Sequence, residues 1–397
     1  MTIKLRSAKI KNFKSLGDVE LSFRDLTIIV GSNSSGKSNS LEALNLLRRL
    51  LLAESLPSLE AMGDLLRYGR DSIYTTIAIE DGDNLAEYTV VIQLDKINTL
   101  ISRENLKING INVIDILNGE GEVRDEDGGN SQKYQSDPKS IESLALRAAG
   151  NFGNKPLTKR LASYIREWKF YDIDPDLIRS RASRSGKLIQ MFEGISRNSN
   201  NNQIIPSLDT KASKVQEILK YLAENEIDKF ELISQEISEL LNISLGCDRE
   251  DYDIKIIEAD EQEIPLANMS DGTLRLIAYF VLLYQSDIPP LICIEEPERN
   301  LHPGILINLA SIMKRLSKRT QVVFTTHSSQ LLDCFQSDEI SSDISVLLLS
   351  KKDELGTQSF LLDELAEKRD DLLDWMRDFG LGSAIYHSHL IEQILGI

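Results

Sequence analysis

Cysteine, long apolar runs and positive charge are all scarce in this sequence, and each shortage excludes a class of protein. Only three cysteines, widely separated, occur among the 397 residues, which excludes a disulfide framework and a cysteine-rich zinc site. No apolar run approaches the roughly eighteen residues that a membrane helix needs, and the first residues alternate where a signal peptide would be continuously apolar. The sequence therefore predicts a cytoplasmic protein without a membrane segment.

Negative charge prevails, with a formal net charge of −17, and this excludes a protein that coats nucleic acid non-specifically. Any nucleic-acid contact would be a local basic patch, and a solvated charged face is the favoured interpretation of each basic segment. The candidate patch residues are Lys155, Lys159, Arg160, Arg166 and Lys169, followed by Arg179, Arg181, Arg184 and Lys187. A hydrophobic content of 41% is ample for a core, and the length allows two or three domains.

A glycine-rich segment between a predicted strand and a predicted helix is the most informative feature present. The apolar run 26–30 precedes Gly31–Ser38, whose pattern is G-x-x-x-x-G-K-S, and 39–47 has the spacing of an amphipathic helix. Such a loop presents backbone N–H groups and a helix N-terminus to phosphate oxygens, and this context disfavours the alternative of a plain surface turn. We expect Lys37 to reach the β- and γ-phosphates of ATP and Ser38 to hold Mg²⁺. The expected nucleotide contacts are Asn33, Ser34, Ser35, Gly36, Lys37, Ser38 and Asn39.

A second motif places two carboxylates at the end of an apolar run. Residues 291–294 are apolar and are followed by Glu295 and Glu296, as when a buried strand delivers acids to its carboxyl end beside a nucleotide. We expect Glu295 to support Mg²⁺ and Glu296, on the opposite side of the strand, to activate the attacking water. A strand that simply ends in solvated acids is the alternative, and the neighbouring motifs disfavour it.

Two further segments carry polar residues where anions bind. Ser270 and Gly272 open an apolar helix expected over 276–284, and such a helix start is a second anion site. His327 follows the apolar run 322–324 at a third predicted strand end, where it is placed to sense the γ-phosphate. Four nucleotide-site motifs therefore occur in order along one chain.

Alternating patterns predict two β-hairpins in the first part of the chain. Residues 3–10 with 19–23, and 73–79 with 88–94, alternate apolar and polar positions across turn-like segments. We expect the two hairpins to share one sheet beside the nucleotide strand. Residues 105–156 lose this periodicity and contain acidic, glycine-rich stretches, which predict a mobile loop.

Helical spacing predicts an inserted subdomain between two halves of a split ATP-binding core. The expected helices cover 157–168, 211–222 and 228–241, with a polar loop at 198–202, and no heptad repeat is long enough for a coiled coil. The predicted regions are an N-terminal ATPase lobe with the phosphate loop and a β subdomain (1–104), a mobile loop with the inserted helical subdomain (105–250), a C-terminal ATPase lobe (251–350) and a helical tail (351–397).

The order of these motifs resembles the ABC-class ATPases of the OLD-like group, which belong to the AAA domains of the SMC/RecF type. The stretch Glu295–Pro303, E-E-P-E-R-N-L-H-P, is especially characteristic of that group. The resemblance implies an α/β fold: a P-loop NTPase of the ABC-type head class with a mixed sheet, an antiparallel β subdomain and an inserted helical subdomain. It also implies a homodimer, or a higher homo-oligomer of dimers, in which Ser270 and Gly272 contact ATP on the partner's phosphate loop and Arg299–His302 lie at the interface.

Two departures from the resembling group matter. Glu295 stands where most ABC ATPases have aspartate, which implies slow hydrolysis. OLD nucleases carry a further Toprim domain of about a hundred residues, whereas only seventy residues follow His327. Asp363, Glu364 and the pair 370–371 are better interpreted as solvated helix acids, so we expect no nuclease centre in this chain.

The resemblance implies an ATP-driven switch that regulates a separately encoded effector, a nuclease or a toxin, in bacterial defence against phage. The first alternative is a DNA-repair ATPase of the RecF kind, which clamps duplex DNA in its ATP-bound dimer. The second is a scaffold in which nucleotide is a structural ligand. ATP-dependent DNA binding would distinguish the first alternative, and an absence of turnover the second.

Overall fold

The computed structural model describes most of the chain, whose contacts divide it into two compact units. The described residues are 3–53, 56–95, 98–136, 143–183, 206–248, 254–340, 343–352, 354–368 and 370–386. Unit 1 comprises Met1–Phe170, Pro289–Glu296 and Thr320–Ile397, and unit 2 comprises Tyr171–Ile288 and Pro297–Arg319. Each unit is therefore assembled from segments that lie far apart in the sequence.

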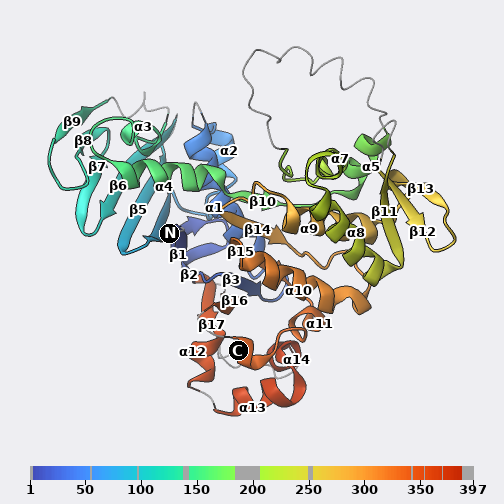
Figure 1. The fold of residues 1–397 in the computed structure, drawn as a ribbon. Helices are drawn as coiled ribbons and strands as arrows, with labels where there is room; N and C mark the ends of the chain where they lie inside the picture. Colours follow the sequence, from blue (N-terminus) through green and yellow to red (C-terminus); the bar gives the residue numbers. More distant parts are fainter. Residues whose placement is uncertain are drawn as a thin grey trace, which may run out of the picture. The chain divides into compact units, whose positions relative to one another are not determined.

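Among the described residues, unit 1 contains an antiparallel sheet of eight strands in the order β2-β1-β4-β5-β6-β7-β8-β9 (Figure 1). The strands are β1 (Lys4–Phe13), β2 (Leu16–Ser22), β4 (Ser72–Asp81), β5 (Asn84–Leu94), β6 (Thr99–Ile108), β7 (Ile111–Leu117), β8 (Glu120–Val123) and β9 (Gln132–Gln135). Both predicted hairpins are confirmed, and β1 pairs with β4, so they share one sheet. Their expected place beside the nucleotide strand is wrong, because that strand pairs in another sheet.

The prediction of a mobile loop over 105–156 is wrong for the residues that the structure describes there. Strands β6 to β9 and helix α3 (Leu146–Ala149) occupy much of this segment. The buried Glu104 carboxylate of β6 accepts hydrogen bonds from the Tyr88 hydroxyl at 2.8 Å and from two N–H groups at the start of α3 at 2.6 and 2.7 Å. Burial raises the pKa of Glu104. The segment is thus tied to the sheet by a buried polar cluster, which hydrophobic periodicity does not reveal.

A second sheet has the order β10-β14-β15-β3-β16-β17. Its strands are β10 (Lys169–Tyr171), β14 (Leu291–Glu295), β15 (Gln321–Thr326), β3 (Leu26–Val30), β16 (Ile344–Lys352) and β17 (Gly356–Leu361). Strands β14, β15, β3 and β16 are parallel, whereas β17 is antiparallel to β16. Every residue of β3 is buried, as expected for a parallel strand covered on both faces. The predicted mixed α/β class with a separate antiparallel sheet is confirmed.

The helices of unit 1 include the one that the phosphate loop opens and the one predicted over 157–168. They are α1 (Lys37–Leu52), α2 (Leu59–Gly63), α3, α4 (Pro156–Glu167), α11 (Ser329–Leu332), α12 (Leu362–Ala366), α13 (Asp370–Phe379) and α14 (Leu381–Tyr386). No described helix of the chain has the length and apolar character needed to cross a membrane.

Unit 2 combines helices with a small antiparallel sheet. Its helices are α5 (Pro175–Ser183), α7 (Val215–Asn225), α8 (Ile227–Leu241), α9 (Asp271–Tyr284) and α10 (Leu306–Ser317), and its strands are β11 (Ile243–Cys247), β12 (Ile254–Glu258) and β13 (Glu263–Pro265). Helix α8 buries Phe230, Ile233 and Ile237 at the predicted helical spacing. Helix α7 begins four residues later than predicted, and the polar loop predicted at 198–202 lies outside the described residues.

Candidate functional site

The carboxyl ends of three neighbouring parallel strands gather predicted site residues at one edge of the second sheet. Glu295 of β14 faces Thr325 of β15, and Thr325 faces Ile29 of β3. Figure 1 draws these strands side by side. Adjacent strands lie about 4.8 Å apart, so groups that follow them are within reach of one nucleotide. The phosphate loop follows β3, Glu296 follows β14 and His327 follows β15.

The phosphate loop packs closely around a buried lysine. Gly36 has a left-handed φ of 107°, and a Cβ there would lie 2.4 Å from the Thr357 hydroxyl oxygen, so only glycine fits. Lys37 is 8% exposed, and its ammonium donates to the Gly31 carbonyl at 2.8 Å and to the next carbonyl at 3.1 Å. The Ser35 hydroxyl is buried without a hydrogen-bond partner among the described residues. A buried cation, an unsatisfied hydroxyl and a helix N-terminus together suit phosphate oxygens.

The remaining predicted loop residues differ in exposure. Three of them are exposed: Asn33, Ser34 and Ser38. Asn39 is half-buried, and its amide donates to the Ser15 hydroxyl at 2.8 Å. Ser38, in the first turn of α1, and Glu295, the last residue of β14, supply the oxygen donors that Mg²⁺ prefers, and both lie at the same edge of the sheet. The donor set therefore fits the predicted metal.

Glu296 adopts a backbone conformation that is rare for a residue with a side chain. Its φ is 44°, in the left-handed region, which costs about 1–2 kcal/mol. Its N–H donates to the Thr325 carbonyl at 3.0 Å, and its carboxylate lies 3.0 Å from Nδ1 of His327. The contacts hold the strained residue in place and turn its carboxylate toward the histidine that follows the neighbouring strand. The structure thus brings the two predicted catalytic groups of β14 and β15 together.

Ser270 and Gly272 lie in unit 2, at the start of α9. Ser270 is exposed, and its hydroxyl oxygen caps the helix by accepting from the Thr273 N–H at 3.2 Å. A Cβ on Gly272 would lie 2.7 Å from the Asn300 carbonyl oxygen, so glycine permits a close approach of the loop that follows β14. The cap uses the oxygen as an acceptor and keeps the hydroxyl group at the surface.

Asp271 joins the first turn of α9 to two other segments of unit 2. One of its carboxylate oxygens accepts from Arg179 of α5, and the other accepts from the Asn300 amide at 3.2 Å. Arg179 also donates to the Met269 carbonyl at 3.0 Å. Its hydrogen bond to Asp271 raises the pKa of the Arg179 guanidinium. Sequence analysis missed this bracing, because the arginine and the aspartate are 92 residues apart and no local pattern links them.

Residues 26–333 match the protein family described as "AAA domain, putative AbiEii toxin, Type IV TA system". The match covers more than half of the chain and includes the phosphate loop, both carboxylates, the α9 start and His327. The chain belongs to this AAA-domain family.

This AAA-domain protein is also similar to a bacterial protein and to two solved SMC heads. A Helicobacter pylori protein described as "ATP/GTP phosphatase" is 24% identical over 354 residues, which cover 83% of this chain and 86% of that protein. An SMC head solved with the C-winged helix domain of ScpA has a TM-score of 0.50 at 16% identity, covering 91% of this chain and 99% of that one. The SMC head domain from Thermotoga maritima has a TM-score of 0.45 at 14% identity, covering 90% of this chain and 98% of that one. The first of these structures confirms the ABC-type head fold.

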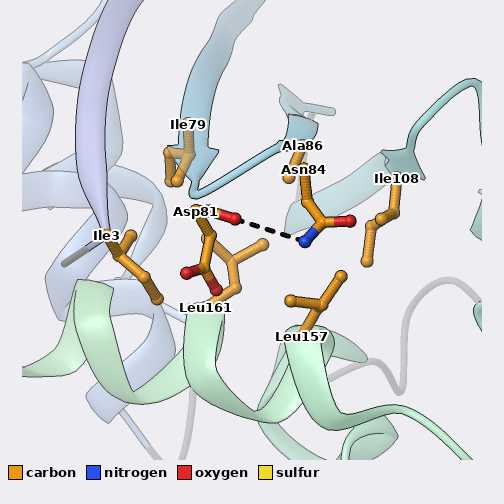
Figure 2. Close-up of a pocket in the computed structure, with 8 residues that line it drawn as sticks. All are labelled: Ile3, Ile79, Asp81, Asn84, Ala86, Ile108, Leu157 and Leu161. Atoms are coloured by element: carbon orange, nitrogen blue, oxygen red, sulfur yellow. Dashed lines mark hydrogen bonds between the residues drawn. The ribbon is translucent and has the colours of Figure 1, made fainter. Parts of the chain in front are cut away.

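A narrow pocket of this AAA-domain protein lies between the eight-stranded sheet and α4 (Figure 2). Its polar groups are engaged within the protein, since the Asn84 amide donates to the Asp81 carbonyl at 3.2 Å and the Asp81 carboxylate pairs with Arg160 at 2.5 Å. The lining residues are Ile3, Ile79, Asp81, Asn84, Ala86, Ile108, Leu157 and Leu161. Side-chain packing accounts for this lining without a ligand.

Several residues of the predicted basic patch are paired with acids. Lys155 is buried and pairs with Asp125 at 3.0 Å, and Arg181 pairs with Glu217 at 3.2 Å. Arg160 and Arg179 pair with Asp81 and Asp271. Arg184 and Lys187 lie outside the described residues. These ion pairs offset part of the positive charge of the predicted patch, and only that of Lys155 is buried.

Proposed function

We propose that this AAA-domain protein is a Mg²⁺-dependent ATPase of the ABC head class. The observation that carries the proposal is the convergence of the phosphate loop, Glu296 and His327 at one sheet edge, with 3.0 Å between the carboxylate and the imidazole. Perturbed or strained residues gather at functional sites, and Glu296 combines a left-handed φ with such a contact.

In the proposed reaction, the phosphate loop and Lys37 bind the β- and γ-phosphates of ATP. Glu296 accepts a proton from water, whose oxygen forms a bond to the γ-phosphorus while the bond to the bridging oxygen of ADP breaks. His327 orients the Glu296 carboxylate and lies where it can donate to the γ-phosphate. Ser38 and Glu295 would hold Mg²⁺, which neutralises charge on the phosphate oxygens when bound.

A second copy of the chain completes the proposed site. The exposed Ser270 hydroxyl stands at the N-terminus of a 14-residue helix, where a phosphate group is favoured. Its oxygen accepts from the Thr273 N–H at 3.2 Å and lies 2.9 Å from the Thr273 hydroxyl oxygen, so an arriving phosphate would compete with Thr273 for the Ser270 proton. The resemblance to OLD-like ATPases supports the same arrangement, in which Ser270 and Gly272 contact ATP on the partner's phosphate loop.

The ATPase is proposed to act as a switch on a separately encoded effector in phage defence. The family description names a toxin–antitoxin system, which supports a role in defence, and the separate effector rests on the resemblance to OLD-like ATPases. The alternative, a RecF-like DNA clamp, is disfavoured by the net charge of −17 and by the ion pairs of the basic patch. ATP-dependent capture of duplex DNA by the Glu296→Gln protein would reverse this preference.

The first test measures ATP binding and phosphate release by the wild type and by Lys37→Ala. We expect slow, Mg²⁺-dependent release by the wild type and at least about a 100-fold loss of ATP affinity in the variant, because the loop loses its only mobile cation. Lys107→Ala, which removes an exposed lysine of β6, is the matched control and should behave as the wild type. Unchanged ATP affinity in Lys37→Ala would contradict the phosphate-loop assignment.

A further inference from the structure

Two residues outside the phosphate loop, together with Asn39 of α1, form a chain of hydrogen bonds that ends on the loop backbone. Ser15 lies in the turn between β1 and β2, and Thr357, fully buried, lies at the start of β17. The Ser15 and Thr357 hydroxyl oxygens are 3.0 Å apart, and Thr357 donates to the Ser35 carbonyl at 2.9 Å. Asn39 donates to Ser15 at 2.8 Å. The phosphate loop is therefore hydrogen-bonded to Thr357, which is more than 300 residues from both Ser35 and Ser15 in the sequence.

The directions of these hydrogen bonds follow from the chemistry of the two ends. A carbonyl oxygen only accepts, so the Thr357 hydroxyl donates its single proton to Ser35. The Ser15 hydroxyl must then donate to Thr357, and it accepts from the Asn39 amide. Each hydroxyl donates once and accepts once. The hydrogen bonds therefore form a relay from the Asn39 amide through Ser15 and Thr357 to the Ser35 carbonyl, in which each hydroxyl proton has an acceptor.

The backbone around the relay leaves little room for movement. Arg67 donates to the Ser15 carbonyl at 2.9 Å and to the Glu354 carbonyl at 3.1 Å, which joins Glu354 to the β1–β2 turn. Gly356 has a φ of 82°, and a Cβ there would lie 2.2 Å from an Arg67 guanidinium nitrogen. The Thr357 N–H also donates to the Ser15 carbonyl at 2.9 Å, so the backbone as well as the side chain of Thr357 is tied to the β1–β2 turn.

We propose that Thr357 is a positioning residue for nucleotide binding, and that Ser15 and Asn39 support it. In a trans peptide the N–H points opposite to the C=O of the same plane. By holding the Ser35 carbonyl toward β17, Thr357 directs the Gly36 N–H to the opposite side of the loop, where the phosphates of the proposed function bind. The peptide needs no reorientation when ATP arrives, so the relay raises ATP affinity and does not act on the chemical step.

The test compares Thr357→Val, which keeps the shape and loses the hydroxyl, with Thr357→Ser, which keeps the hydroxyl. ATP dissociation constants, kcat and thermal stability are measured for each purified full-length protein. We expect about a fivefold to tenfold weaker ATP affinity in Thr357→Val, restoration in Thr357→Ser, and a kcat at saturating ATP within about threefold of the wild type. Ser345→Ala is the matched control, because it removes another buried hydroxyl of the same sheet that donates to Thr27 at 3.2 Å.

The inference rests on the proposed function, and the outcomes separate the two. Wild-type ATP binding with unchanged binding by Thr357→Val overturns the relay alone. Equal losses of affinity in Thr357→Val and Ser345→Ala also overturn it, because they would reflect general destabilisation. Absence of ATP binding by the wild type overturns the proposed function itself.

Discussion

The phosphate loop of unit 1 and the α9 start of unit 2 are both expected to contact phosphate, yet they are built in opposite ways. Ser35 and Lys37 are 1% and 8% exposed, and Thr357 fixes the loop backbone from a distant strand. Ser270, in contrast, is exposed at the tip of its helix, although the turn beneath it is braced by Arg179 and Asn300.

This difference in exposure indicates which half of the proposed site can bind a nucleotide within a single subunit. A loop whose lysine is buried and whose peptide groups are already directed by the protein is expected to bind a nucleotide within one subunit. An exposed helix start can contact a phosphate from one side only. It therefore needs a second subunit that holds the nucleotide against it. Nucleotide binding is therefore expected of one subunit, and hydrolysis of two.

Glu296→Gln separates binding from hydrolysis most strongly. We expect ATP affinity to stay within about threefold and hydrolysis to fall by at least about 100-fold, since the amide keeps the shape and cannot accept the proton of water. Size-exclusion chromatography should show an ATP-stabilised dimer. Glu87→Gln makes the same chemical change at an exposed residue of β5 and should leave both quantities unchanged. Rapid turnover by Glu296→Gln would assign the base to another group.

The sequence predicted the strand ends of the phosphate-loop half because each is marked locally. Short, mainly apolar runs predicted β3, β14 and β15, and the polar residues after them identified one edge, which the parallel register confirms. Alternation likewise identified both hairpins. Alternation shows that one face of a strand is buried and not which strand lies beside it, so the sheet to which the hairpins belong could not be predicted.

Other features had no local signal that identifies their hydrogen-bond partners. Glu104 is a buried carboxylate in the middle of β6, where it interrupts the apolar pattern, and its partners lie on β5 and at the start of α3. Thr357 and Arg179 act through contacts with residues 322 and 92 positions away. Hydrogen bonds over such separations depend on the folded arrangement, which residue spacing does not encode.

Ser270→Arg tests the exposed half of the comparison. A bulky cation at the α9 start should block the approach of a second subunit and leave the buried phosphate loop of its own chain intact. We expect ATP affinity within about threefold of the wild type and hydrolysis reduced by about tenfold to 100-fold, measured by phosphate release. Full hydrolysis by this variant would contradict a dimeric ABC mechanism.

Mixing Ser270→Arg with Lys37→Ala sharpens that test. The first chain retains its phosphate loop and the second retains its Ser270, so a mixed dimer contains one intact composite site. Partial hydrolysis should return on mixing, once mass spectrometry has shown that mixed dimers form. If mixed dimers form and hydrolysis does not return, the sites are either not shared between subunits or unable to act singly.

The smallest expected effect concerns the bracing beneath Ser270. Arg179→Met removes the guanidinium that holds Asp271 and the Met269 carbonyl, so the α9 start loses part of its fixed direction. We expect kcat to fall about threefold to tenfold with unchanged ATP affinity, because the phosphate loop belongs to the other unit. Arg181→Met is the matched control, since Arg181 lies on the same helix and pairs with Glu217 at 3.2 Å. An equal fall in both variants would trace the effect to loosening of α5, whereas a fall confined to Arg179→Met would show that hydrolysis depends on the direction of the exposed helix start.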